Sequence, residues 1–159
     1  NVDENSALSG NEYTKKIDEY AKENNSEVLL ISAKIESEIS QISDMQDKQD
    51  FLESLGLKET GLKRVIKKGY EILNYINYFT AGEKELRAWT IVKGPFAPSA
   101  AGTIHSDMEK GFIRAETISY DDYIANNGEA GAKEKGKLRL EGKEYEVKDG
   151  DVMHFLFNV

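Results

Sequence analysis

The stretch YFTAGEKELRAWTIV, residues 78–92, separates two kinds of sequence pattern. Before it, apolar residues recur at helical spacing. Within it, aromatic and β-branched residues cluster on both sides of a Gly-Glu-Lys turn. This pattern predicts a hairpin of two short strands, Tyr78 to Ala81 and Arg87 to Val92. We therefore expect a helical part over residues 1–77 and a strand-rich part over residues 78–159.

The strand-rich part begins with this hairpin and continues through two further strand-like segments. Both prolines lie in KGPFAPSAAG, residues 93–102, which is typical of a loop that leads into a short helix, here Ala100 to Lys110. GFIRAETISYDDYI, residues 111–124, predicts a strand. LRLEGKEYEVKDGDVMHFLFNV, residues 138–159, predicts further strands separated by Gly-Lys and Asp-Gly turns.

Helical spacing dominates the first part of the chain. NEYTKKIDEYAKENN, residues 11–25, places Tyr13, Ile17, Tyr20 and Ala21 on one helical face, with Ser9 or Asn11 as the cap. EVLLIS, residues 27–32, is a continuous apolar run, which is typical of a strand buried on both faces of a parallel sheet. Three more helices are predicted from the apolar sets Ile35, Ile39 and Ile42; Phe51, Leu52 and Leu55; and Leu62, Val65, Ile66, Ile72 and Leu73.

The charge of the chain limits its partners. The 159 residues carry a net charge of −8, so the chain lacks the overall positive charge that drives general nucleic-acid binding. Contact with RNA or a ribosomal protein would need a local surface, for which Lys110, Phe112 and Arg114 are candidates. The alternative interpretation of these three residues is a solvated strand edge.

Composition also bears on location and on metal chemistry. The sequence contains no cysteine, so it can form neither a disulfide nor a thiolate metal site. No apolar stretch is long enough to span a membrane and the first residues carry no secretory signal, so we expect a cytoplasmic protein. His105 and Asp107 could suggest a charge relay or a metal site. Residues two apart on a helix point in different directions, however, so we interpret His105 as a residue that caps or docks the short helix.

One segment has the spacing of a phosphate-binding loop. GAKEKGKL, residues 131–138, matches that motif up to its lysine but has Leu138 where the magnesium-binding Ser or Thr belongs. A phosphate loop must open a helix, because its free backbone N–H groups bind the anion there. Here the Gly-Lys pair is expected to open a strand. We therefore interpret the segment as a flexible loop rich in glycine and lysine.

A second motif points to purine binding. NVDE, residues 1–4, has the Asn-x-x-Glu pattern, a variant of the Asn-Lys-x-Asp motif with which GTPases bind guanine. Glu adds one methylene to the carboxylate arm and should weaken guanine preference. The same pattern occurs at residues 24–27 and 126–129, but only the first copy is followed by a helix, a buried strand and the loop Ser32-Ala33-Lys34. The alternative is an ordinary αβ unit with a chance tripeptide.

Several long motifs resemble one known family. YFTAGEKELRAWTI, APSAAGTIHSDMEKGFIRAETI, GEAGAKEKGKLRLEGKEYEVKDGDVMHF and the closing FNV are similar to the C-terminal region of the YchF family, the Obg-like ATPases of the P-loop GTPase superfamily. The resemblance implies an α/β remnant of a P-loop nucleotide-binding domain with trailing helices over residues 1–77. Over residues 78–159 it implies an α+β, ubiquitin-like β-grasp domain of the TGS type.

The resemblance also implies a function. The family prefers ATP to GTP, so the adenine site would comprise two short segments of this chain, namely Asn1, Val2 and Glu4 with Ser32, Ala33 and Lys34. The family's P-loop and Mg²⁺ ligands have no counterpart in this sequence, so the chain alone should be inactive although the parent is an ATPase and weaker GTPase. The implied partner of the TGS domain is the large ribosomal subunit or structured RNA, with the chain a monomer. The alternative function is a stand-alone RNA- or ribosome-binding β-grasp module.

Overall fold

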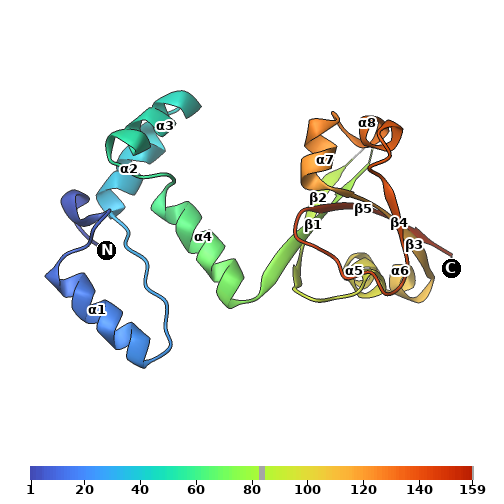
Figure 1. Cartoon of the computed structure of the whole chain (residues 1–159), viewed down its shortest axis with the longest axis horizontal. Helices are drawn as coiled ribbons and strands as arrows, with labels where there is room; N and C mark the ends of the chain where they lie inside the picture. Colours follow the sequence, from blue (N-terminus) through green and yellow to red (C-terminus); the bar gives the residue numbers. More distant parts are fainter. Residues whose placement is uncertain (83–84, 159) are drawn as a thin grey trace. The chain divides into compact units, whose positions relative to one another are not determined.

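The computed structural model describes residues 1–82 and 85–158. The chain forms two compact units, Asn1–Gly69 and Tyr70–Val159 (Figure 1). The expected boundary at residue 77 falls inside the first strand of the second unit, β1 (Tyr75–Ala81). That strand begins three residues before the predicted Tyr78, because Tyr75 already pairs with Val92 of the neighbouring strand.

The first unit is helical. Its elements are a 3-10 turn η1 (Glu4–Ser6), α1 (Glu12–Glu23), α2 (Ala33–Gln41), α3 (Met45–Ser54) and the beginning of α4 (Gly61–Ile72). The predicted cap of α1 is confirmed for Asn11, whose side chain accepts hydrogen bonds from the backbone amides of Tyr13 and Thr14. In return, the Thr14 hydroxyl accepts a hydrogen bond from the backbone N–H of Asn11. This reciprocal arrangement is a capping box, and it fixes where the helix begins.

A small apolar core holds α2 and α3 together. The buried residues are Ala7, Ile35, Ile39, Leu52 and Leu57, so the predicted apolar face of α2 is confirmed at Ile35 and Ile39. Two other predicted faces are exposed in this unit. The exposed side chains on them are Tyr13, Ile17 and Tyr20 of α1 and Leu62, Val65 and Ile66 of α4, whereas Ala21, the fourth residue predicted for the face of α1, is buried.

The prediction of a strand over residues 27–32 is wrong. These residues have no regular secondary structure, and Val28 to Ile31 are half-buried. A strand needs a neighbouring backbone. In the described residues, one backbone hydrogen bond joins this run to another segment. The Val2 N–H donates to the Ile31 carbonyl at 2.7 Å. One such bond does not make a ladder.

The second unit is built on a five-stranded mixed sheet. Its strands are β1, β2 (Leu86–Val92), β3 (Phe112–Ser119), β4 (Arg139–Glu141) and β5 (Asp151–Phe157), in the order β2-β1-β5-β3-β4. Strands β1 and β5 run parallel, and the other neighbours are antiparallel. The hairpin predicted from residues 78–92 is therefore confirmed, although Glu83 and Lys84 of its turn lie outside the described residues.

Short helices cover both faces of this sheet. The pair α5 (Ala97–Ile104) and α6 (Ser106–Lys110) lies on one face, and α7 (Tyr120–Ala125) and α8 (Glu129–Glu134) lie on the other (Figure 1). The core lies between the sheet and α5, where Tyr78, Ala100 and Met153 are at most 1% exposed. The Tyr78 hydroxyl donates to the carbonyl of Ala100 at 2.9 Å, which satisfies the buried phenol.

Three predicted elements are corrected. The single helix expected over Ala100 to Lys110 is two helices, because the chain is extended at His105. The strand expected over residues 111–124 ends at Ser119, whose side chain caps α7. The segment expected as a flexible loop, residues 131–138, begins inside α8 and turns at Gly136, where φ is 68°. It therefore follows the start of a helix and does not open one, which disfavours phosphate binding.

None of the helices in the part of the chain that the structure describes has the length and apolar character to cross a membrane.

Candidate functional site

The N-terminal tetrapeptide lies beside the loop that begins α2. Three contacts join them: the Val2 N–H to the Ile31 carbonyl at 2.7 Å, the Ala33 N–H to Asn1 Oδ1 at 3.0 Å, and Lys34 Nζ to Glu4 Oε2 at 2.7 Å. Asn1 thereby takes the role of a helix cap from a distant position in the sequence. The structure brings together the two segments that the sequence singles out for purine binding.

Ser32 is the unusual residue of this corner. It occupies the N-cap position of α2, where a serine usually bonds the free amides of the first turn, but its side chain makes no cap bond. Ser32 is 4% exposed, and its Oγ has no hydrogen-bond partner in the structure. A buried hydroxyl without a partner is uncommon in native proteins. The Ser32 hydroxyl is therefore an unsatisfied polar group in the loop that Asn1 contacts.

The Glu4–Lys34 pair sets the charge of the corner. The hydrogen bond and the charge of Glu4 raise the pKa of Lys34 above its ordinary value. Both side chains remain accessible, at 41% for Glu4 and 65% for Lys34. Exposed pairs of this kind contribute little to stability, so Glu4 can exchange its partner for a ligand at small cost.

A cavity of about 320 Å³ also adjoins the tetrapeptide. Its lining includes Asn1 and Val2, together with α1 and Val28 to Leu30, but not Glu4 or Lys34. The cavity is mainly apolar and lies between α1 and the segment that was expected to be a strand. The polar corner and the apolar cavity are therefore two separate features that share Asn1 and Val2.

His105 acts as a helix cap, as the sequence predicts. Its Nδ1 accepts a hydrogen bond from the backbone N–H of Asp107 at 3.2 Å, and the same nitrogen lies 3.4 Å from Asp107 Oδ2. The imidazole is thus engaged at the start of α6. Over residues 1–82 and 85–158, no group of three or more His, Asp or Glu side chains is arranged to hold a metal ion.

Of the three residues proposed to contact RNA or a ribosomal protein, Lys110, Phe112 and Arg114, the aromatic one is buried. Phe112 is only 4% exposed and belongs to the core, whereas Lys110 and Arg114 are exposed. The cause is a β-bulge between Phe112 and Arg114, which breaks the alternation of the strand so that both Ile113 and Arg114 face outward. Simple alternation places Phe112 and Arg114 on one face of the strand, and a bulge leaves no clear signal in a single sequence.

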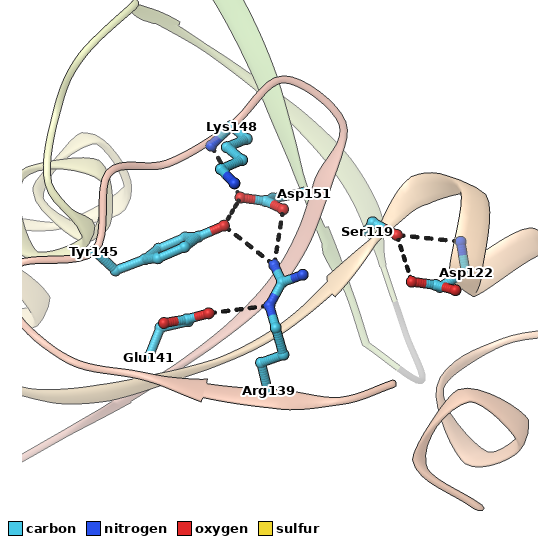
Figure 2. Close-up of polar contacts among 7 residues, drawn as sticks. All are labelled: Ser119, Asp122, Arg139, Glu141, Tyr145, Lys148 and Asp151. Atoms are coloured by element: carbon cyan, nitrogen blue, oxygen red, sulfur yellow. Dashed lines mark hydrogen bonds and ion pairs between the residues drawn. The ribbon is translucent and has the colours of Figure 1, made fainter. Parts of the chain in front are cut away.

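Sequence reasoning also missed a polar network in the second unit (Figure 2). Asp151 is 2% exposed, and its carboxylate accepts hydrogen bonds from the Tyr145 hydroxyl at 2.7 Å and the Lys148 N–H at 2.9 Å. Arg139 lies 3.6 Å from the other carboxylate oxygen and also pairs with Glu141. Burial and the Asp151 carboxylate raise the pKa of Tyr145. The network fixes the turn that leads into β5.

A second polar group, also drawn in Figure 2, fixes the start of α7. The Ser119 hydroxyl accepts from the amide of Asp122 at 3.2 Å and donates to the Asp122 carboxylate at 2.9 Å. Hydrogen bonds from Ser119 and from Lys137 lower the pKa of Asp122. The signal for this cap was present in the sequence, because Ser119 precedes Asp122 by three residues, the spacing of a helix start.

Comparisons with known proteins agree with this architecture. The family YchF-GTPase_C, described as "Protein of unknown function (DUF933)", matches residues 75–158. The chain is 59% identical over 157 residues to the "Ribosome-binding ATPase YchF" of Bacillus subtilis (strain 168), covering 99% of this chain and 43% of that protein. It is 54% identical over 159 residues to the protein of the same name from Escherichia coli O157:H7, covering 100% of this chain and 43% of that protein.

Two solved structures are similar to the chain. The Schizosaccharomyces pombe YchF GTPase aligns with a TM-score of 0.76 and 36% identity, covering 92% of this chain and 39% of that one. A GTP binding protein from Pyrococcus horikoshii OT3 aligns with a TM-score of 0.63 and 18% identity, covering 96% and 44%, which shows a shared fold.

The chain thus has the α/β architecture, with a mixed sheet, of structures from GTP-binding proteins. It belongs to the YchF family. It spans less than half the length of the curated relatives that it matches.

Proposed function

We propose that this chain is the C-terminal portion of an ATP-binding and ATP-hydrolysing switch protein that associates with ribosomes in the cytoplasm. In this proposal, the first unit is the end of a P-loop nucleotide-binding domain and supplies the adenine-contacting corner. The second unit is a β-grasp domain of the TGS type that docks on the large ribosomal subunit, and the protein acts as a monomer. The P-loop and the Mg²⁺ ligands would come from sequence outside this chain.

The observation that carries the proposal is the convergence of Asn1–Glu4 with Ser32–Lys34. Asn1 bonds the Ala33 amide, Glu4 pairs with Lys34, and the unpartnered hydroxyl of Ser32 lies in the same loop. The family resemblance assigns these same residues to the base. The name of these relatives, ribosome-binding ATPase, supports ATP as the nucleotide and the ribosome as the partner.

Base selectivity tests the role of Glu4. The chain is joined to the N-terminal remainder of the Bacillus subtilis relative, and turnover of ATP and GTP is measured. We expect the chimera to hydrolyse ATP in preference to GTP, and we expect Glu4→Asp to shift the ratio toward GTP, because the shorter arm restores the carboxylate position that accepts from guanine. Glu129→Asp is the matched control, since Glu129 lies in another Asn-x-x-Glu match that has no adjoining Ser-Ala-Lys loop. A chimera without ATP turnover, or an unchanged ratio in Glu4→Asp, would refute the assignment.

A stand-alone binding module remains the second candidate function. The supporting observation is that the second unit has a core of its own, centred on Tyr78, Met153 and Phe155. Exposed Lys110 and Arg114 are the proposed contacts with ribosomal RNA. Co-sedimentation of the chain with ribosomes tests this surface, with Lys110→Glu plus Arg114→Glu as the variant. Wild-type chain should pellet and the double variant should not; equal pelleting would exclude this surface.

A further inference from the structure

A pocket of about 380 Å³ opens in the second unit, among β1, the start of α7 and the turn before β5. Two aromatic rings line it, Phe79 and Tyr120, with centroids 6.2 Å apart and planes tilted by 39°. Two carboxylates line it as well, Asp121 and Asp149. Tyr120 is 51% exposed, so its ring is accessible to a ligand.

The turn on one side of the pocket is held rigidly. The Asn77 N–H donates to Asp149 Oδ1 and the Gly150 N–H donates to the Asn77 carbonyl, both at 2.8 Å. Gly150 has φ of 83°, which favours glycine, and a Cβ there would lie 3.3 Å from Tyr120 Cβ. The turn therefore packs closely against Tyr120, and the Asp149 carboxylate has a fixed position before any ligand binds.

The pocket carries negative charge that the neighbouring residues do not neutralise. Two nearby acidic residues are neutralised: Asp122 pairs with Lys137, and Asp151 pairs with Arg139. No ion pair is described for Asp121 or Asp149 over residues 1–82 and 85–158, and the lining includes no Lys or Arg. A cationic group is therefore the complementary ligand, both to the carboxylates and to the aromatic faces.

Asn77 lines the pocket, and its side chain is held by hydrogen bonds. Its Oδ1 accepts from the Thr90 hydroxyl at 2.7 Å, and Thr90 Oγ1 lies 3.3 Å from the Tyr70 hydroxyl. This chain of bonds fixes the orientation of the amide. Hydrogen bonds from Thr90 and from Asn77 lower the pKa of Tyr70, so the Asn77 side chain is already engaged within the protein.

We propose that this pocket binds an arginine side chain from a basic protein segment. The planar guanidinium stacks on the Tyr120 and Phe79 rings and donates to the Asp121 and Asp149 carboxylates. Charge separates this partner from RNA, because the phosphates of RNA would be repelled by the same carboxylates. This inference rests on the ribosome docking proposed above. The arginine would belong to a basic protein of the ribosome on which the second unit docks.

Direct binding tests the pocket. The full chain is titrated with a short glycine–serine peptide that carries spaced arginines, and with a twin in which citrulline replaces each arginine. Citrulline keeps the shape and removes the charge. Binding is measured by calorimetry and by NMR shifts of the Asn77 and Gly150 amides. We expect the arginine peptide to bind at least roughly tenfold more tightly than its twin and to shift both amides.

Variants locate the contact. Asp121→Asn plus Asp149→Asn should weaken the arginine peptide roughly tenfold, and Asn at position 149 keeps an oxygen acceptor for the Asn77 amide. Asp18→Asn plus Asp50→Asn makes the same change of charge in the first unit and should leave binding unchanged. Tyr120→Leu should weaken binding while Tyr120→Phe should not. The fluorescence of Trp89, the single tryptophan, monitors the folding of the second unit in each variant.

Three results would overturn the proposal: equal affinity for the two peptides, undiminished binding by the folded double variant, or shifts of these amides by single-stranded polyuridine but not by the arginine peptide. Ribosome co-sedimentation separates this test from that of the proposed function. Peptide binding by a chain that fails to pellet with ribosomes would refute ribosome docking and leave the pocket supported. Pelleting without peptide binding would support docking and refute the pocket.

Discussion

The carboxylate of Glu36, on α2, accepts a 2.6 Å hydrogen bond from the backbone N–H of Gly61, the first residue of α4. Its second oxygen accepts from Leu62 N at 3.2 Å. A helix start needs acceptors for its free amides, and Glu36 supplies them from another helix. Arg64, in the first turn of α4, forms a second contact, because its guanidinium donates to the Leu30 carbonyl at 2.7 Å. The segment before and after the Ser-Ala-Lys loop therefore anchors the first turn of α4.

Removing the Glu36 carboxylate should destabilise the first unit. Glu36→Ala leaves two amides of α4 without their acceptor and removes a negative charge from a helix N-terminus, so we expect a loss of about 1–2 kcal/mol. Glu36→Gln keeps one acceptor oxygen and should lose less. Urea unfolding, followed by NMR signals of α2 and α4, measures the change. Glu19→Ala, on the exposed side of α1, is the control and should stay within about 0.5 kcal/mol of wild type; a Glu36→Ala loss no larger than this would contradict the capping role.

Tyr145→Phe should weaken the polar network around Asp151. The variant removes the 2.7 Å hydrogen bond to a buried carboxylate that then has one donor fewer. Hydrogen bonds to charged groups contribute about 1.5–3 kcal/mol, and we expect a loss of stability at the lower end of that range. Guanidinium unfolding followed by Trp89 fluorescence reports on the second unit. Tyr123→Phe serves as the matched control, because no hydrogen bond from the Tyr123 hydroxyl is described among residues 1–82 and 85–158. An unchanged midpoint for Tyr145→Phe would show that the bond contributes nothing.

The second unit should lose stability in alkali. Burial raises the pKa of both Tyr78 and Tyr145 above the ordinary tyrosine value. In the unfolded chain these phenols ionise near pH 10, whereas in the folded unit they stay protonated. Their contribution is therefore complete below about pH 10 and decreases as the pH rises above it, because the unfolded state then binds fewer protons. Unfolding free energies at several pH values between about 8 and 11 should fall more steeply above pH 10 in wild type than in Tyr145→Phe. Parallel curves would contradict the assignment to Tyr145.

Gly111→Ala should disrupt the pairing of β3 with the end of β5. A Cβ at Gly111 would lie 2.0 Å from the backbone oxygen of Asn158, which cannot move without breaking the bond from the Asn158 N–H to the Gly111 carbonyl. Overpacking of this kind costs about 1–3 kcal/mol. Gly142→Ala is the control, because a Cβ at Gly142 meets nothing within 4 Å. The melting temperatures of both variants are measured by thermal unfolding. Equal melting temperatures would show that the backbone at Asn158 shifts without loss of stability.

Local signals explain what the sequence could predict. The Asn11 cap, the buried face of α2 and the β1–β2 hairpin depend on residues close together in the chain, and all three are confirmed. The approach of Asn1 to Ala33 is long-range, and it was predictable only because the order of a known motif implied it.

The failures have equally definite causes. The apolar run at residues 27–32 was predicted as a strand from composition, but strand formation depends on a partner backbone that a composition does not reveal. Phe112 was predicted to lie on the surface because two basic residues flank it, whereas the bulge after it leaves Phe112 in the core and turns Arg114 outward. The acidic pocket was missed because Phe79, Tyr120 and Asp149 come from three separate segments, and a single sequence does not show which segments meet.

The strand order has a consequence for biosynthesis. The central position of the sheet is held by β5, the last of the five strands to be translated, which separates the β1–β2 hairpin from β3 and β4. During synthesis, the two outer pieces cannot join until residues Asp151–Phe157 have left the exit tunnel. The second unit therefore assembles only after its last strand has emerged, and a nascent chain stalled before Asp151 would expose two unpaired strand edges to aggregation.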